Sequence, residues 1–218
     1  MSNLIASLVT LKNFEIEAAT QPSDDSLIVS YRSIDGNRPH TFGNTVALWD
    51  VTMPDPEFDH PLTTADIETD ANRGSILIKH DLQGIDYLVT YQVGALTTMC
   101  AQLRLSLSLT AMSAPPNSIT MSVEQLTDTS ITLRYDTLGG YLPQTYNNWV
   151  GIWSGFPNPF RAGTPAGRAE VPNATEGLVP IPNISIEPTF NYTVVYHMGN
   201  SEKGTDVGAA LSFTAKQP

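Results

Sequence analysis

The chain is poor in cysteine, in basic residues and in long apolar runs. A single cysteine, Cys100, among 218 residues excludes an intrachain disulfide. Lysine and arginine number 11 against 22 aspartates and glutamates, a net charge of -11. This balance argues against binding to nucleic acid or to anionic membranes, because both draw affinity from clustered basic side chains. The sequence also has no bilayer-length apolar run and no basic leader, which predicts a cytoplasmic protein without a membrane span. Export without a signal peptide stays open.

Motifs for common catalytic chemistry are missing as well. The sequence has no glycine-rich phosphate loop, no nucleophile elbow and no zinc-binding helix motif. Its four histidines show no metal-ligand spacing, and Cys100 stands in an apolar stretch that favours a small strand residue over a nucleophile. These absences favour a nonenzymatic protein without deciding the matter.

What is present is an internal repeat. Residues 26–50 align without a gap on residues 130–154, with eight identities such as Tyr31 with Tyr135 and Trp49 with Trp153. A second match relates residues 85–94 to residues 190–199. Each copy is about a hundred residues long, the usual size of one domain. We therefore predict a tandem duplication with copy one at 1–110, a short linker at 111–117 and copy two at 118–218.

Apolar residues alternate with a period of two in both copies. Leu27, Val29 and Tyr31 fall on one face of a predicted strand, and Ile131, Leu133 and Tyr135 repeat the pattern. No segment of helical length shows apolar residues at three-and-four spacing. The predicted strands lie near 12–19, 26–32, 44–51, 74–79, 85–93 and 99–109 in copy one, and near 118–124, 130–136, 148–154, 177–182, 190–198 and 206–215 in copy two.

The segment from Ile184 to Tyr196 resembles the penultimate-strand region of fibronectin type III domains, with its apolar residue, proline turn, tyrosine and alternating valines. The resemblance implies that Tyr192, and Tyr87 in copy one, bond back to the backbone at a corner. Trp49 and Trp153 stand one strand later than the usual tryptophan of fibronectin type III domains, a position closer to that in immunoglobulin-like domains. We expect both indoles to pack between the two sheets of their sandwich. The expected fold is all-β: two tandem antiparallel sandwiches similar to immunoglobulin and fibronectin type III domains.

An acidic loop in copy one is the candidate metal site. Asp66, Glu68, Asp70 and Asn72 gather hard oxygen ligands of the kind that calcium prefers, and Asp55, Glu57 and Asp59 precede them. The spacing departs from a regular calcium loop, and copy two has Arg161, Arg168 and Glu170 in the corresponding region, so a calcium site would belong to copy one only. Calcium is therefore the only candidate cofactor, with an ordinary solvated loop as the alternative.

The loop between the second and third predicted strands is the candidate ligand site. In copy two it carries Tyr141, Tyr146 and Trp149 beside the amides of Asn147 and Asn148, a chemistry suited to sugars or protein surfaces. In copy one the same loop carries Arg38 and His40. Residues shared by both copies are best explained by the fold, so residues that differ are better places to look for function.

Three functions remain open. The leading one is a nonenzymatic binding or assembly protein that presents loops or sheet edges to a protein or carbohydrate partner. The second is a small-molecule-binding or catalytic protein with a cleft between the two domains. The third is a self-associating structural protein, a homo-oligomer, because exposed sheet edges can pair across subunits.

Overall fold

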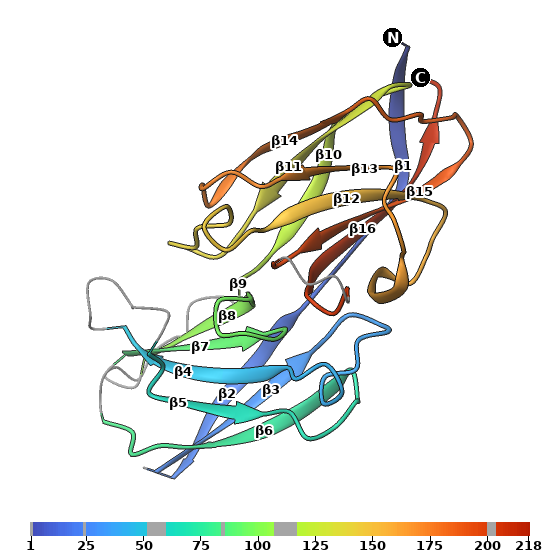
Figure 1. The fold of residues 1–218 in the computed structure, drawn as a ribbon. Coiled ribbons are helices and arrows are strands. Elements are labelled where there is room, and N and C mark those ends of the chain that lie inside the picture. The colour runs from blue at the N-terminus through green and yellow to red at the C-terminus, as the bar shows by residue number, and fades with distance from the viewer. Residues whose placement is uncertain (1, 24, 52–59, 84–85, 107–116, 200–203) are drawn as a thin grey trace. The chain divides into compact units, whose positions relative to one another are not determined.

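A computed structural model of the chain describes residues 2–23, 25–51, 60–83, 86–106, 117–199 and 204–218 (Figure 1). The chain divides into two compact units. The central unit is Phe14–Ser118, and the terminal unit combines Met1–Asn13 with Ile119–Pro218. Within the described residues every regular element except the 3-10 turn η1 (Pro159–Arg161) is a β-strand. Each unit is an antiparallel β-sandwich, as the alternating sequence pattern predicts.

Two sheets form the central unit. The first has the strand order β2-β3-β6, and the second has the order β5-β4-β7-β8-β9. The strands are β2 (Glu15–Ser23), β3 (Ser26–Arg32), β4 (Thr45–Asp50), β5 (Thr63–Asp66), β6 (Arg73–Lys79), β7 (Asp86–Gln92), β8 (Met99–Ser106) and β9 (Asn117–Ser118).

The core of the central unit is aromatic. The ring of Tyr91 lies 5.1 Å from Phe14 and 5.6 Å from Tyr31 between ring centroids. Leu27 and Val29, on the same face of β3 as Tyr31, are fully buried. The period-two pattern read from the sequence thus marks the buried face.

The terminal unit has the strand order β13-β12-β15-β16-β1-β10-β11-β14. It repeats the central arrangement, because β12 lies between β13 and β15 as β4 lies between β5 and β7. The strands are β1 (Asn3–Asn13), β10 (Thr120–Thr127), β11 (Ser130–Asp136), β12 (Trp149–Ser154), β13 (Gly167–Glu170), β14 (Glu176–Pro182), β15 (Asn191–His197) and β16 (Val207–Lys216).

The N-terminal strand requires a correction to the predicted domain boundaries. We expected residues 1–110 to form one domain, yet β1 pairs with β16 from Ile5↔Lys216 to Asn13↔Ala209. Its first residues, Asn3 and Leu4, pair with β10 instead, so β1 joins the two sheets of the terminal unit. A period-two pattern marks a strand but not its partner, so the sequence could not place β1. Residues 107–116, which hold most of the predicted linker, lie outside the described residues.

The strand before copy two makes the reciprocal pairing. Short β9 pairs with β8 of the central unit, through Ala101↔Ser118 and Gln102↔Asn117. Each copy is therefore preceded by a strand that pairs with the last described strand of the other copy. The chain passes between the units at Asn13/Phe14 and again at Ser118/Ile119.

Both predicted corner tyrosines are confirmed. The hydroxyl of Tyr192 accepts the backbone N–H of Glu187 at 2.8 Å. The hydroxyl of Tyr87 accepts the N–H of Gln83 at 2.8 Å and donates to its carbonyl at 3.1 Å. Each bond fixes the loop that leads into the penultimate strand, which is the role that the fibronectin resemblance implies.

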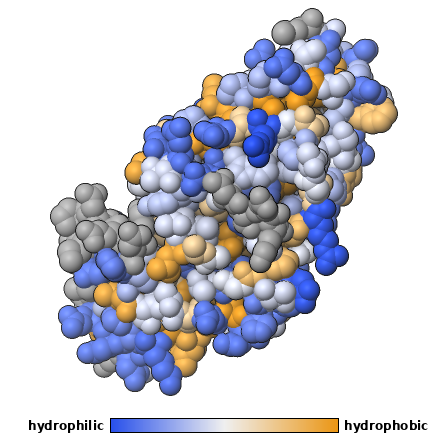
Figure 2. Space-filling model, in the orientation of Figure 1, coloured by the Kyte–Doolittle hydropathy of each residue, from blue (hydrophilic) through white to orange (hydrophobic). Residues whose placement is uncertain are grey.

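The visible surface is mostly hydrophilic, with hydrophobic residues scattered over it (Figure 2). Large apolar side chains that are exposed include Leu8 on β1 and Phe156 after β12. No helix within the described residues is long and apolar enough to cross a membrane.

Candidate functional site

Alternation along β12 divides its side chains between two faces. Val150 and Ile152 are buried in the core, and Trp149, Gly151 and Trp153 lie on the opposite face of the sheet. Trp153 is therefore not an inter-sheet residue, as we expected from the sequence, but part of an aromatic cluster on the outer face. Trp49 occupies the equivalent outer position in the central unit.

Gly151 allows the two indoles to close over the strand. A Cβ at this position would lie 2.6 Å from Trp153 Cη2 and 2.8 Å from Trp149 Cζ3, closer than real Cβ contacts. The ring centroids of the two tryptophans are 6.3 Å apart. A side chain larger than glycine would separate the rings, so the cluster depends on this residue.

Backbone carbonyls hold both indoles in place. Trp149 Nε1 donates to the carbonyl of Gly199 at 3.0 Å, and Trp153 Nε1 donates to the carbonyl of Gly163 at 3.1 Å. Both polar tips are thus satisfied inside the protein. A ligand would meet rings whose positions are already fixed.

His197 completes the cluster from the neighbouring strand β15. It is the cross-strand partner of Trp149, and the two rings stack with centroids 4.1 Å apart and an interplanar angle of 7°. Its Nδ1 lies 3.0 Å from Oδ1 of Asp206. The other ring nitrogen, Nε2, is buried and has no hydrogen-bond partner.

Two pockets adjoin this cluster, and Trp149 and Arg168 line both. One, of about 640 Å³, is also lined by Trp153, His197 and Arg161. The other, of about 490 Å³, adds Gln144, Asn147 and Glu170. Arg168, on β13, places its guanidinium over the Trp149 ring, 5.8 Å from the centroid, a cation–π contact.

The central unit has no such cluster among its described residues. At the positions of Trp149 and His197 it carries Thr45 and Gln92, and Thr45 Oγ1 donates to Gln92 Oε1 at 3.1 Å. The lone indole, Trp49, donates to Thr90 Oγ1 at 2.7 Å. The polar side chains on this face of the central unit hydrogen-bond to one another. The outer face of the terminal unit carries an aromatic cluster instead.

Two of the predicted ligand residues, Tyr141 and Asn148, are fully buried. Asn148 accepts a hydrogen bond from the hydroxyl of Tyr196 at 3.2 Å and donates to Tyr141 at 3.3 Å. In the central unit, Tyr91 likewise donates to Asn44 at 2.9 Å. Burial raises the pKa of the Tyr196 phenol well above its usual value. These side chains hold the loop on the core.

The other predicted ligand residues reach the surface. Asn147 is exposed, and Tyr146 and Trp149 are half-buried. Tyr146 packs on Tyr141 at 5.2 Å between centroids, so only part of it faces solvent. Arg38 and His40 are exposed on the central unit and lie apart from any aromatic cluster described there.

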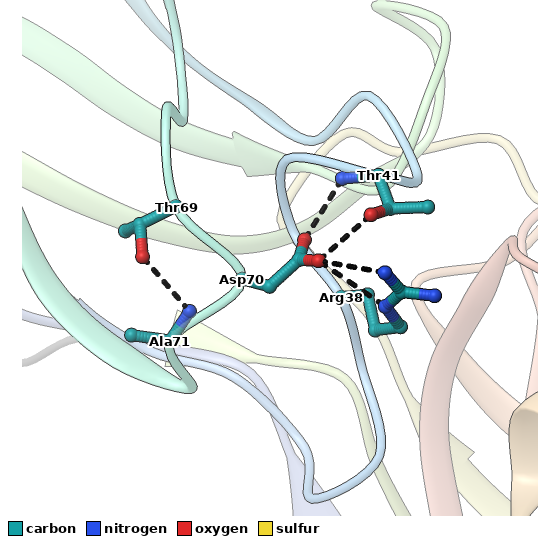
Figure 3. A network of polar contacts seen from close by, with 5 residues as sticks. All are labelled: Arg38, Thr41, Thr69, Asp70 and Ala71. Carbon is teal, nitrogen blue, oxygen red and sulfur yellow. Dashed lines mark hydrogen bonds and ion pairs between the residues drawn. The ribbon is translucent and has the colours of Figure 1, made fainter.

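The acidic loop of the central unit is held by protein contacts (Figure 3). The Asp70 carboxylate accepts the backbone N–H of Thr41 at 2.9 Å and its hydroxyl at 2.7 Å. Arg38 Nη2 lies 3.1 Å from the same group. The bonds from Thr41 and the charge of Arg38 lower the pKa of Asp70.

The terminal unit makes the equivalent hydrogen bonds without a charged group. Thr145 N–H donates to Asn173 Oδ1 at 2.9 Å, and Asn173 Nδ2 donates to Thr145 Oγ1 at 3.0 Å. The amide of Asn173 takes the place of Asp70. These hydrogen bonds therefore hold the loop in both units, with or without a charge.

Calcium binding at Asp66, Glu68, Asp70 and Asn72 stays a prediction. No cluster of three or more histidine, cysteine, aspartate or glutamate side chains fit to hold a metal occurs in the described part of the chain. Asn72 lies near Asp35, with its Nδ2 3.4 Å from Oδ1. Asp55, Glu57 and Asp59 lie outside the described residues.

Sequence reasoning missed Arg161, Arg168, His197 and Trp153 as site residues. One available signal was the difference between the copies, because His197 and Trp149 replace Gln92 and Thr45 at paired strand positions. The pairing itself appears only in the fold.

No family model matches the chain, and a search of curated proteins gives no match. Among solved structures the chain is similar to the crystal structure of the chicken CNTN1 FN1-FN3 domains, at 12% identity and a TM-score of 0.31. The similarity covers 96% of this chain and 66% of that one, so the chain spans about two thirds of the neighbour's length. Likeness at this level carries no argument about function. The class of the protein is that of an all-β chain of antiparallel sandwiches.

Proposed function

We propose that the protein is a nonenzymatic binding protein, and that the outer face of the terminal unit around Trp149 engages a carbohydrate or protein partner. The observation that carries the proposal is the fixed stack of Trp149 on His197, which is flanked by two pockets. Aromatic and arginine side chains are enriched where proteins bind partners. Rings that are ordered before binding lose little conformational freedom on contact.

Differences between the units also support this proposal. The central unit satisfies its outer face internally through Thr45, Thr90 and Gln92, whereas the terminal unit leaves His197 Nε2 without a partner. A site built on these residues is single and asymmetric.

A glycan array and a peptide array probed with the labelled full chain test the proposal. The expected result is a ligand whose binding falls at least tenfold in Trp149→Ala and is unchanged in His60→Ala, an exposed residue of the central unit. Binding that survives Trp149→Ala would place the site elsewhere. The interdomain-cleft and self-association hypotheses stay predictions, and sedimentation at several concentrations tests the latter.

A further inference from the structure

Two of the seven arginines differ from the other five in their ion pairing. All seven lie in described residues, and five of them form ion pairs with carboxylates, namely Arg32, Arg38, Arg73, Arg104 and Arg134. Arg161 and Arg168 have no carboxylate partner among the described residues. In a chain with twice as many acidic as basic residues, this arrangement leaves two guanidinium groups available to an external anion.

Both of these arginines line the larger pocket beside Trp153 and His197. Arg161 ends the 3-10 turn η1, which Asn158 caps by accepting the N–H of Phe160 at 3.0 Å. Buried Phe160 anchors the turn to the terminal unit. Arg168 is held by its contact with Trp149. A guanidinium stacked on a ring keeps its N–H edge available for a bidentate oxyanion.

The unpartnered nitrogen of His197 belongs to the same pocket. His197 lines the cavity, and Asp206 occupies its Nδ1, which leaves Nε2 as the nitrogen for a ligand. Buried polar atoms without partners are uncommon in folded proteins. With Nδ1 donating to the Asp206 carboxylate, Nε2 of a neutral ring is an acceptor, so a ligand hydroxyl would satisfy it.

The distribution of charge between the two units favours anion binding in the terminal unit. The terminal unit carries six lysines and arginines against eight aspartates and glutamates, whereas the central unit carries five against 14. The central unit thus holds nine of the eleven excess negative charges, and the terminal unit is close to neutral. Repulsion of an anionic ligand is correspondingly weaker around Arg161 and Arg168.

The adjoining pocket indicates which kind of anion fits. Besides Arg168, its lining includes the exposed amides of Gln144 and Asn147 and the exposed carboxylate of Glu170. An amide both donates to and accepts from hydroxyl groups, and a carboxylate accepts from them, and sugars present hydroxyl groups in numbers. A carboxylate subsite next to a hydroxyl subsite matches an acidic sugar with a neighbouring sugar better than it matches an acidic peptide.

We propose that the terminal unit binds a carboxylate-bearing sugar. The carboxylate of this sugar lies between Arg161 and Arg168. The hydroxyl groups of the adjacent sugar unit in the ligand face Gln144, Asn147 and Glu170. The inference rests on the proposed function, because it assigns a ligand class to the same face.

Calorimetric titration of the full chain with paired oligosaccharides tests the inference. One member of each pair ends in a uronic acid and the other in its neutral counterpart. The acidic member is expected to bind at least about tenfold more tightly, the effect of one good charge-assisted contact. This preference is expected to disappear in Arg168→Gln and in Arg161→Gln, and to shrink as salt rises. The matched control is Arg134→Gln, an ion-paired arginine of the same unit.

The outcomes separate this inference from the proposed function. Equal binding of acidic and neutral sugars through Trp149 would overturn the carboxylate subsite and leave the binding function standing. Preference for an acidic peptide over the acidic sugar would overturn the sugar class. Absence of binding to every sugar and peptide tested would remove both proposals. Unchanged melting temperatures of the variants show that a lost preference does not come from unfolding, and Arg168→Lys provides a second, milder variant.

Discussion

Nδ1 of His197 lies 3.0 Å from Oδ1 of Asp206, and the two side chains are only 5% and 6% exposed. Replacing Asp206 by alanine removes the acceptor and leaves a second ring nitrogen buried without a partner. The expected loss in the free energy of unfolding is about 1–3 kcal/mol, measured by urea titration. Glu124→Ala is the control, because its ion pair with Arg134 is exposed and worth less than about 1 kcal/mol. Equal effects of the two substitutions would contradict a special role for the buried pair.

Gly151→Ala is expected to separate the two indoles. The added Cβ overlaps Trp149 and Trp153, so we expect a loss of about 1–3 kcal/mol and a change in near-UV circular dichroism. Gly139→Ala is the matched control, since a Cβ there meets nothing within 4 Å. An unchanged spectrum in Gly151→Ala would show that the cluster does not need a glycine.

Removal of residues 1–13 is expected to weaken the terminal unit and spare the central one. Strand β16 loses its β1 partner, so amide exchange in β16 should accelerate about tenfold or more, equivalent to at least ~1.4 kcal/mol of local stability. Exchange in β8, which pairs with β9, serves as the internal reference. If exchange quickened equally in β8, the strand would support the whole chain rather than one unit.

Cys100 is expected to resist thiol reagents in the folded protein. Complete burial raises the pKa of its thiol well above the usual 9.0, so the reactive thiolate is absent. The unfolded thiol ionises as pH rises past 9.0 and the folded one only at higher pH, so stability falls as pH rises beyond 9.0. Labelling rates at pH 7 and pH 9, with and without denaturant, check this. Rapid labelling of the folded chain at pH 9 would contradict the burial.

Asp70 should make the central unit sensitive to acid. Its folded pKa lies below the ordinary value of 3.8, so its contribution is present above that value and is lost as pH falls through the folded pKa. Asp70→Asn keeps an acceptor for Thr41, as Asn173 does in the terminal unit, and loses the ion pair with Arg38. We expect a shallower acid limb in melts between pH 5 and about 2. An identical acid limb would mean that other carboxylates dominate.

Period-two alternation predicted most of the strands, because a buried face forces apolar residues into that spacing. It missed β5 and β13, whose four residues each are too few and too polar to show a pattern. It also missed β1, because pairing with β16 depends on a sheet edge that only the folded chain creates.

The candidate site was harder to predict than the fold. Alignment of the two copies places Trp149 opposite Thr45, but the stacking partner of Trp149, His197, is brought beside it only by the register of β12 on β15. Tyr141 and Asn148 looked like ligand residues because their chemistry suits sugars, yet the same hydroxyl and amide suit a buried hydrogen-bond network. Side-chain chemistry alone does not distinguish these uses.

The reciprocal pairing of β1 with β16 and of β9 with β8 has a genetic consequence. Cutting the gene between the copies would yield two fragments, each lacking a strand that its fold requires. A contiguous terminal unit would instead need Pro218 joined to Met1, since β1 and β16 run antiparallel with Ile5 opposite Lys216, and both ends of the chain lie at the same end of this unit (Figure 1). Because of this exchange, loss of either copy would remove a strand from the sheet of the other.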